Sequence, residues 1–141
     1  MTLDGNPLWS VDPGVGTECR WHGGLGDVDG DGKLELGMPH RGGFRCYDAA
    51  DGRLRWELPD VKGSTDVITA DIDGDRKDEF IFGSGNSLVA LKAEADTGSM
   101  LWSLDLETQV GAPVAADVNG DGFAEILVGT ADGVLNIISG K

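Results

Sequence analysis

Three short acidic stretches hold the residues best suited to chemistry. Each follows the pattern Asp-x-Asp/Asn-x-Asp-x-x-x-Glu, and they begin at Asp27, Asp71 and Asp117. Oxygen-bearing side chains fall at loop positions 1, 3, 5 and 9, and position 7 can add a backbone carbonyl. Such dense oxygen donors suit Ca²⁺, which takes about six to eight oxygen ligands in flexible geometry. The predicted metal ligands, with position 7 acting through its carbonyl, are Asp27, Asp29, Asp31, Lys33, Glu35, Asp71, Asp73, Asp75, Lys77, Glu79, Asp117, Asn119, Asp121, Phe123 and Glu125.

These loops differ from the EF-hand loop, which ends in a bidentate Glu at position 12. That position holds Met38, Phe82 or Val128, none of which can bind a metal. Apolar residues typical of strands flank each loop instead, so we expect it to join two strands. Simple acidic turns are the alternative, but three of them at the same place in a long repeat favour metal binding.

Two substitutions distinguish the loops. Arg76 replaces Gly at position 6 and predicts a distorted second site. Asn119 predicts weaker Ca²⁺ affinity in the third site.

A repeat of about 45 residues organises the chain. The loop starts are 44 and 46 residues apart, and a Gly-x-x-x-Trp motif recurs in phase, ending at Trp9, Trp56 and Trp102. No segment shows helical periodicity. We expect four short strands per unit, illustrated by the ranges 67–69, 80–82, 87–91 and 100–102 in the second unit. The fold class predicted is all-β, with three four-stranded antiparallel repeats as blades of a partial or oligomer-completed β-propeller.

The Asp-x-Asp-x-Asp-Gly loops between strands resemble the FG-GAP/VCBS repeats of integrin-type β-propellers. Residues 91–102, Leu-Lys-Ala followed by Asp-Thr-Gly-Ser-Met-Leu-Trp, resemble the repeats of pyrroloquinoline-quinone-type propellers, in which the Trp packs between blades. Together the two resemblances cover nearly the whole chain. They imply up to three Ca²⁺ ions and an extracellular, periplasmic or cell-surface location, although the N-terminus shows no signal peptide.

We expect a single repeat domain over residues 1–141, divided into repeats at about 10–56, 57–102 and 103–141. The chain stops where a fourth strand with its Trp is due, and residues 1–9 resemble that strand, so they are predicted to supply a closing strand. Three arrangements remain open. The chain is part of a longer propeller, pairs with a second copy into a six-bladed ring as a homodimer, or forms an open three-bladed solenoid.

Composition narrows the class of partner. The net charge of −14 argues against nucleic acid and anionic membranes. No apolar run approaches the roughly 18 residues of a membrane helix, so membrane insertion is not expected.

Cys19 and Cys46 are the only cysteines. One strand is predicted to lie between them. Their Cα atoms would then be farther apart than the roughly 7 Å that a disulfide tolerates, so we expect two unpaired, half-buried thiols.

The first repeat departs from the others on the rim opposite the acidic loops. Arg20, Trp21 and His22 stand at the start of its first strand, and His40 and Arg41 between its second and third strands. Arginine suits a carboxylate or phosphate, histidine can move a proton, and tryptophan can stack on a sugar. These five residues form a candidate ligand-binding site. The alternative is a divergent blade with a solvated basic rim.

The function expected is a calcium-stabilised β-propeller repeat module for protein or carbohydrate recognition, in a larger secreted or cell-surface protein. The alternative is a fragment of a propeller enzyme, either a polysaccharide lyase or a quinone-type dehydrogenase. Binding is favoured over catalysis because no nucleophile–base pair, Gly-x-Ser-x-Gly motif, Walker loop or dinucleotide fingerprint is visible. No catalytic residue is therefore predicted.

Overall fold

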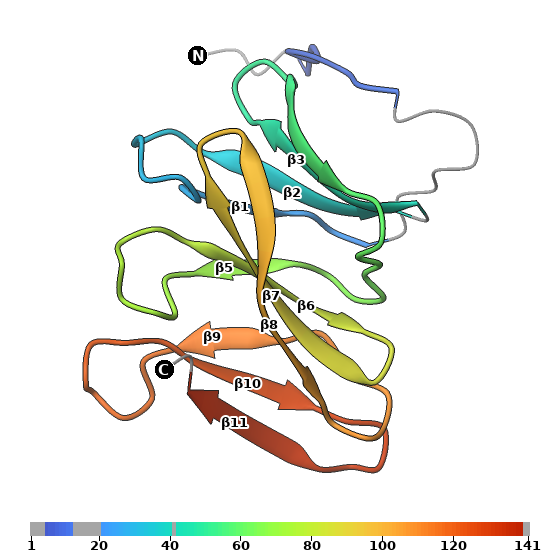
Figure 1. The fold of residues 1–141 in the computed structure, drawn as a ribbon, viewed down its shortest axis with the longest axis vertical. Helices are drawn as coiled ribbons and strands as arrows, with labels where there is room; N and C mark the ends of the chain where they lie inside the picture. Colours follow the sequence, from blue (N-terminus) through green and yellow to red (C-terminus); the bar gives the residue numbers. More distant parts are fainter. Residues whose placement is uncertain (1–4, 13–20, 41, 140–141) are drawn as a thin grey trace.

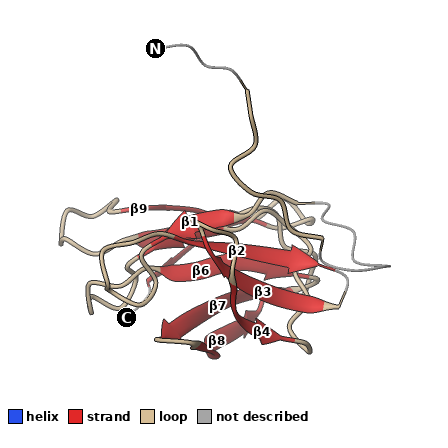
Figure 2. Ribbon diagram, turned by 90° about the horizontal axis from the view of Figure 1, so that it is seen from above, coloured by secondary structure: helices blue, strands red, loops and turns tan. Residues whose placement is uncertain are grey.

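The computed structural model describes residues 5–12, 21–40 and 42–139, and these form three antiparallel β-sheets (Figure 1). Figure 2 shows strands and loops and no helix in this part of the chain. The first sheet has the order β1 (Gly24–Gly26), β2 (Glu35–His40), β3 (Gly43–Asp48) and β4 (Leu54–Leu58). The second has the order β5 (Ile68–Ala70), β6 (Glu79–Ser84), β7 (Ser87–Glu94) and β8 (Thr97–Asp105). The all-β prediction is confirmed, and the sheets are consistent with a β-propeller-like repeat.

The third sheet has three strands among the described residues. They are β9 (Val114–Ala116), β10 (Glu125–Gly129) and β11 (Leu135–Ser139), with β10 in the centre. Residues 5–12 belong to no strand, and Trp9 lies on the first sheet, where its Nε1 donates a hydrogen bond of 3.1 Å to the Ala49 carbonyl. The closing role of residues 1–9 and the repeat boundaries stay predictions, and residues 1–4 lie outside the described residues.

The sheets pack face to face through two apolar layers. Successive residues of a strand point to opposite faces. Phe80 and Phe82 of β6 therefore face the first sheet, where the ring of Phe44 stacks on Phe82 with centroids 5.1 Å apart. Ile81, between them, faces the third sheet and packs with Ile126. The short strands β1, β5 and β9 lie side by side, so the acidic loops that follow them emerge together.

Trp56 couples the first sheet to the second. Its ring lies against Gly98 of β8, where an added Cβ would come within 2.3 Å of the ring. Trp9 lies against Gly52 in the same way, at 2.6 Å. In both contacts, the Trp of one Gly-x-x-x-Trp motif covers the Gly of the next. Only a residue without a side chain fits under the ring.

Cys46 is a free cysteine in the centre of β3. It is fully buried rather than half-buried as predicted, and burial raises the pKa of its thiol to about 12. Its side chain packs with Phe44 and Trp56 in the layer between the first two sheets. Cys19 lies outside the described residues.

Candidate metal-binding loops

The three acidic loops project from the same edge of the stacked sheets, on the left in Figure 1. They join β1 to β2, β5 to β6 and β9 to β10. Each loop touches the next: the Lys77 side chain lies against Gly30, and the Phe123 ring lies against Gly74. In both cases position 7 of one loop covers position 4 of the preceding loop. The loops therefore form one continuous acidic edge.

Hydrogen bonds within the first loop orient its carboxylates. Both oxygens of Asp27 accept backbone N–H groups, from Gly30 at 2.8 Å and Gly32 at 3.0 Å. Oδ1 of Asp29 accepts the N–H of Asp31 at 3.1 Å, which leaves Oδ2 of Asp29 for another partner. Glycines 30 and 32 have φ of 80° and 84°, a backbone conformation that favours glycine.

The second loop keeps this geometry in spite of Arg76. Arg76 has φ of 71°, and its N–H donates to Oδ2 of Asp71 at 3.0 Å, as Gly32 does to Asp27. The predicted distortion is therefore not seen. A non-glycine residue in this region costs roughly 1 kcal/mol, which the hydrogen bonds to Asp71 help to offset.

The Glu at position 9 is buried in every loop. Glu35 and Glu79 are 1% exposed and Glu125 is 5% exposed. Oε2 of each accepts the N–H of position 2, from Val28 at 3.1 Å, from Ile72 at 2.9 Å and from Val118 at 3.0 Å, respectively. The sequence predicted these glutamates as metal ligands, which stays a prediction, and it did not predict their hydrogen bond to the backbone N–H of position 2. That bond joins the start of the loop to the strand that follows.

Two groups of carboxylate oxygens could each hold a metal ion. In the first two loops, the carboxylates at positions 1, 3 and 9 have oxygens within 4.8 Å of one another: Asp27, Asp29 and Glu35, then Asp71, Asp73 and Glu79. This all-oxygen donor set fits a hard cation such as Ca²⁺. In the third loop, Nδ2 of Asn119 donates to Oε1 of Glu125 at 2.8 Å, so an amide donor stands where the other loops have a carboxylate.

Arg55 of β4 faces the first group, and sequence reasoning missed it. Its Nη2 lies 2.8 Å from Oδ2 of Asp29, and its Nη1 lies 3.5 Å from Oε1 of Glu35. Its Nε binds Asp96, in the second sheet's β7–β8 turn. The sequence does single out this residue, because Arg55 stands directly before Trp56, whereas leucine stands directly before Trp9 and Trp102. The guanidinium thus neutralises part of the first group from within the chain.

In the part of the chain that the structure describes, the second group has no such counter-charge. Among the described residues, no cationic side chain forms an ion pair with Asp71, Asp73 or Glu79. Burial, followed by repulsion from Asp73 and its neighbours, raises the pKa of Glu79 to about 7, although the Ile72 hydrogen bond lowers it. Burial also raises the pKa of Glu35, where Arg55 works in the opposite direction. The second group therefore has less compensation of its negative charge than the first.

The predicted rim site is described only in part, because Arg20 and Arg41 lie outside the described residues. The exposed His22 has its Nδ1 3.2 Å from Oδ2 of Asp66, a partner in the second repeat. His40 is buried, and its Nδ1 accepts the Gly42 N–H at 3.1 Å. Burial and then Arg45 lower the pKa of His40. Trp21 is half-buried. The convergence of these residues on one ligand stays a prediction.

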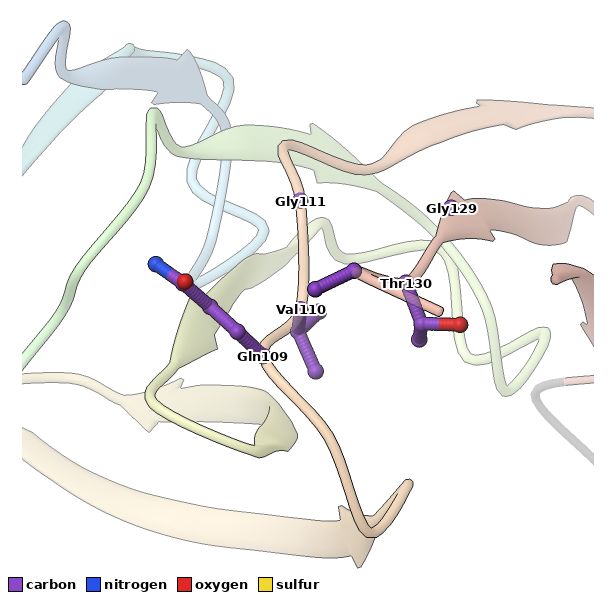
Figure 3. Close-up of a pocket in the computed structure, with 6 residues that line it drawn as sticks. Gln109, Val110, Gly111, Gly129 and Thr130 are labelled. Carbon is purple, nitrogen blue, oxygen red and sulfur yellow. The ribbon is translucent and has the colours of Figure 1, made fainter. Parts of the chain in front are cut away.

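A small hollow lies on the same rim in the third repeat (Figure 3). It is lined by Gln109, Val110, Gly111, Gly129, Thr130 and Ala131. Backbone hydrogen bonds of 2.9 Å from Gly111 to Gly129 and from Ala131 to Gln109 join its two walls. None of the lining side chains is charged, so this hollow offers neither an acid nor a base.

A family model matches part of the chain, from the second acidic loop to the middle strand of the third sheet. Residues 71–128 match the FG-GAP-like repeat. This match supports the FG-GAP family and includes two of the three acidic loops. No curated protein matches the chain. Within residues 5–12, 21–40 and 42–139, no helix has the length and apolar character needed to cross a membrane.

Proposed function

We propose that the chain is a calcium-stabilised β-propeller repeat module that recognises a protein or carbohydrate ligand within a larger secreted or cell-surface protein. One observation carries the calcium part. Asp71, Asp73 and the buried Glu79 bring their oxygens within 4.8 Å of one another without a cationic partner among the described residues. The FG-GAP-like match to residues 71–128 supports the same assignment, because such repeats often bind Ca²⁺.

Each residue of the second group would have a separate role in holding Ca²⁺. Asp71 organises the loop backbone through Gly74 and Arg76, and Asp73 holds the N–H of Asp75. Glu79 opens β6 and binds the N–H of Ile72, so it connects the site to the sheet. A bound Ca²⁺ supplies the positive charge that offsets repulsion among these carboxylates. The β5–β6 hairpin is then held at both ends of its loop.

The calcium proposal is tested by titrating the purified chain with Ca²⁺ and Mg²⁺ in a calorimeter and by thermal unfolding in Ca²⁺ or EDTA. We expect Ca²⁺ to raise the unfolding temperature, and Glu79→Gln to remove part of that increase. Asp60→Asn is the matched control, because Asp60 is an exposed carboxylate outside the loops. Equal unfolding temperatures in millimolar Ca²⁺ and in EDTA would contradict the proposal.

For recognition, we propose the rim around Trp21 and His22 as the contact surface. The exposed imidazole of His22 and the half-buried indole of Trp21 offer hydrogen bonding and stacking to a sugar acid. Binding of oligouronates should weaken at least tenfold in Trp21→Ala and His22→Ala. Thr97→Ala, at the start of β8 at the opposite end of the second sheet, should bind as the unmodified chain does. Unchanged binding in both rim variants would exclude this surface.

A further inference from the structure

The guanidinium of Arg55 is enclosed by oxygens from two sheets. Its Nη2 lies 2.8 Å from Oδ2 of Asp29, and its Nη1 lies 3.5 Å from Oε1 of Glu35, both in the first acidic loop. From the second sheet, Asp96 binds its Nε, and the Ala95 carbonyl accepts a bond of 3.4 Å from Nη2. All three nitrogens thus have an oxygen partner, and the side chain is 10% exposed. Arg55 is therefore held in place from both sides.

A β-bulge in the first sheet aims Arg55 at the acidic loop. The register of β3 against β4 shifts between Cys46 and Tyr47, and Arg55 is the extra residue. An extra residue of this kind re-aims a side chain. The second sheet has the same bulge between β7 and β8, and its extra residue is Leu101, which packs on an apolar layer. At the position where the first repeat has a guanidinium, the second repeat therefore has an aliphatic side chain.

The carboxylate oxygens at positions 1, 3 and 9 of the first loop all have N–H partners. Both oxygens of Asp27, Oδ1 of Asp29 and Oε2 of Glu35 accept N–H groups of the loop backbone. The two that remain, Oδ2 of Asp29 and Oε1 of Glu35, are those that Arg55 faces. A metal ion at this place would have to displace the guanidinium or lie beside it. Like charges repel strongly where little water screens them, and the Asp29 and Glu35 side chains are 7% and 2% exposed.

The second loop leaves the two matching oxygens free. Oδ1 of Asp73 and Oε2 of Glu79 accept backbone N–H groups, as their counterparts in the first loop do. No donor among the described residues binds Oδ2 of Asp73 or Oε1 of Glu79. In the third loop, the Asn119 amide donates to Oε1 of Glu125. The second loop is thus the one in which positions 3 and 9 both keep an oxygen for an ion.

We propose that Arg55 is the resident cation of the first loop and excludes Ca²⁺ from Asp29 and Glu35, so that the second loop binds the ion. This inference rests on the proposed calcium function and assigns it to one loop. Arginine stays charged at every physiological pH, so its charge is present with or without Ca²⁺. The same side chain ties the first sheet to the β7–β8 turn, which reaches up beside that sheet (Figure 1). An ion pair between sheets then replaces the first predicted Ca²⁺ site.

The two aspartates at loop position 3 give a matched test by calorimetric titration with Ca²⁺. Asp73→Asn should weaken Ca²⁺ binding at least tenfold, because it removes charge and a free oxygen from the second loop. Asp29→Asn should weaken Ca²⁺ binding less than threefold, because the Asp29 carboxylate is paired with Arg55. Equal weakening by the two variants, or a larger effect of Asp29→Asn, would overturn the proposal.

The exclusion itself is tested by equilibrium dialysis of Arg55→Met against Ca²⁺, with circular dichroism to show that the chain is folded. Arg55→Met should bind one more Ca²⁺ than the unmodified chain does, and adding Asp29→Asn should remove that ion. Arg53→Met, at an exposed residue just before β4, should bind as the unmodified chain does. A folded Arg55→Met chain without an additional ion would contradict the proposal.

The outcomes for the calcium function and for Arg55 are distinct. An unmodified chain that binds no Ca²⁺ would contradict the proposed function, whereas an additional ion in Arg55→Met would still show that Arg55 excludes it. Conversely, Ca²⁺ binding that is lost in Glu79→Gln, with no additional ion in Arg55→Met, would support the function and overturn the role of Arg55. If Arg55→Met does not fold, the comparison of Asp29→Asn with Asp73→Asn decides.

Discussion

At the residue scale, one motif produces three different charge balances. The carboxylates of the first loop face Arg55, and Glu125 of the third loop accepts a hydrogen bond from Asn119. Among the residues that the structure describes, Glu79 in the second loop faces other acidic groups and a backbone N–H. The same spacing therefore leaves a different amount of uncompensated negative charge in each loop.

Arg55→Met should destabilise the metal-free chain by about 2–4 kcal/mol, because Asp29 and Glu35 would lose the charge that pairs them in a buried setting. Millimolar Ca²⁺ should recover most of this loss, since the two carboxylates become free to bind the ion. Urea unfolding with Ca²⁺ and with EDTA measures both effects. Arg53→Met, an exposed change just before β4, is the control. An equal loss in both conditions would indicate that Arg55 acts through packing.

Glu79→Gln should change how stability depends on pH in EDTA. The pKa of Glu79 rises from 4.5 to about 7 on folding, so its contribution is fully present below pH 4.5 and is lost as pH rises through 7. Between pH 5 and 8 this loss should reach about 3 kcal/mol at most. Glutamine keeps the Ile72 hydrogen bond and never ionises, so the variant should be more stable at pH 8. Glu94→Gln, on an exposed residue, serves as the comparison.

At the scale of elements, the sheets depend on close approach at the Trp–Gly contacts. The ring of Trp56 also packs on Phe44, with centroids 5.9 Å apart, so it cannot shift without disturbing the layer between the first two sheets. This contact joins β4 to β8.

Gly98→Ala should lower stability by about 1–3 kcal/mol, because the added methyl group would lie 2.3 Å from the Trp56 ring. Gly129→Ala provides a matched control at a strand residue with no neighbour within 4 Å of the added carbon. Thermal unfolding in Ca²⁺ compares them. If the two variants unfold at the same temperature, the Trp56 contact does not hold the sheets together.

At the scale of the whole molecule, charge is concentrated on one edge. The chain carries a net charge of −14, and the three loops place eleven carboxylates at the proposed ligand positions along that edge. Repulsion of this kind is screened by salt, whose Debye length is about 10 Å at roughly 0.1 M.

Sodium chloride between about 0.02 and 0.3 M should therefore raise the unfolding temperature in EDTA. The increase should be much smaller in millimolar Ca²⁺, where bound ions already offset the charge. Scanning calorimetry at each salt concentration measures the difference. The same dependence on salt in both conditions would argue against binding at the loops.

Local sequence determined the strands and the form of the loops. Phe80, Ile81 and Phe82 predict a strand buried on both faces, and Asp71 and Asp73 bind N–H groups only two to five residues away. Both partners of such a contact lie within one loop or one pair of strands, so the spacing of residues in the sequence is enough to predict it. Even Arg76 obeys the loop geometry.

Only the tertiary structure decided which charges meet and which surfaces stay open. Arg55 reaches Glu35 from 20 residues away and Asp96 from another sheet. The depth of Cys46 and the position of Trp9 on Gly52 depend on how whole sheets stack. Contacts between distant segments follow from packing, which no local spacing encodes. The repeat determined the three antiparallel sheets, and their stacking determined the balance of charge at each loop.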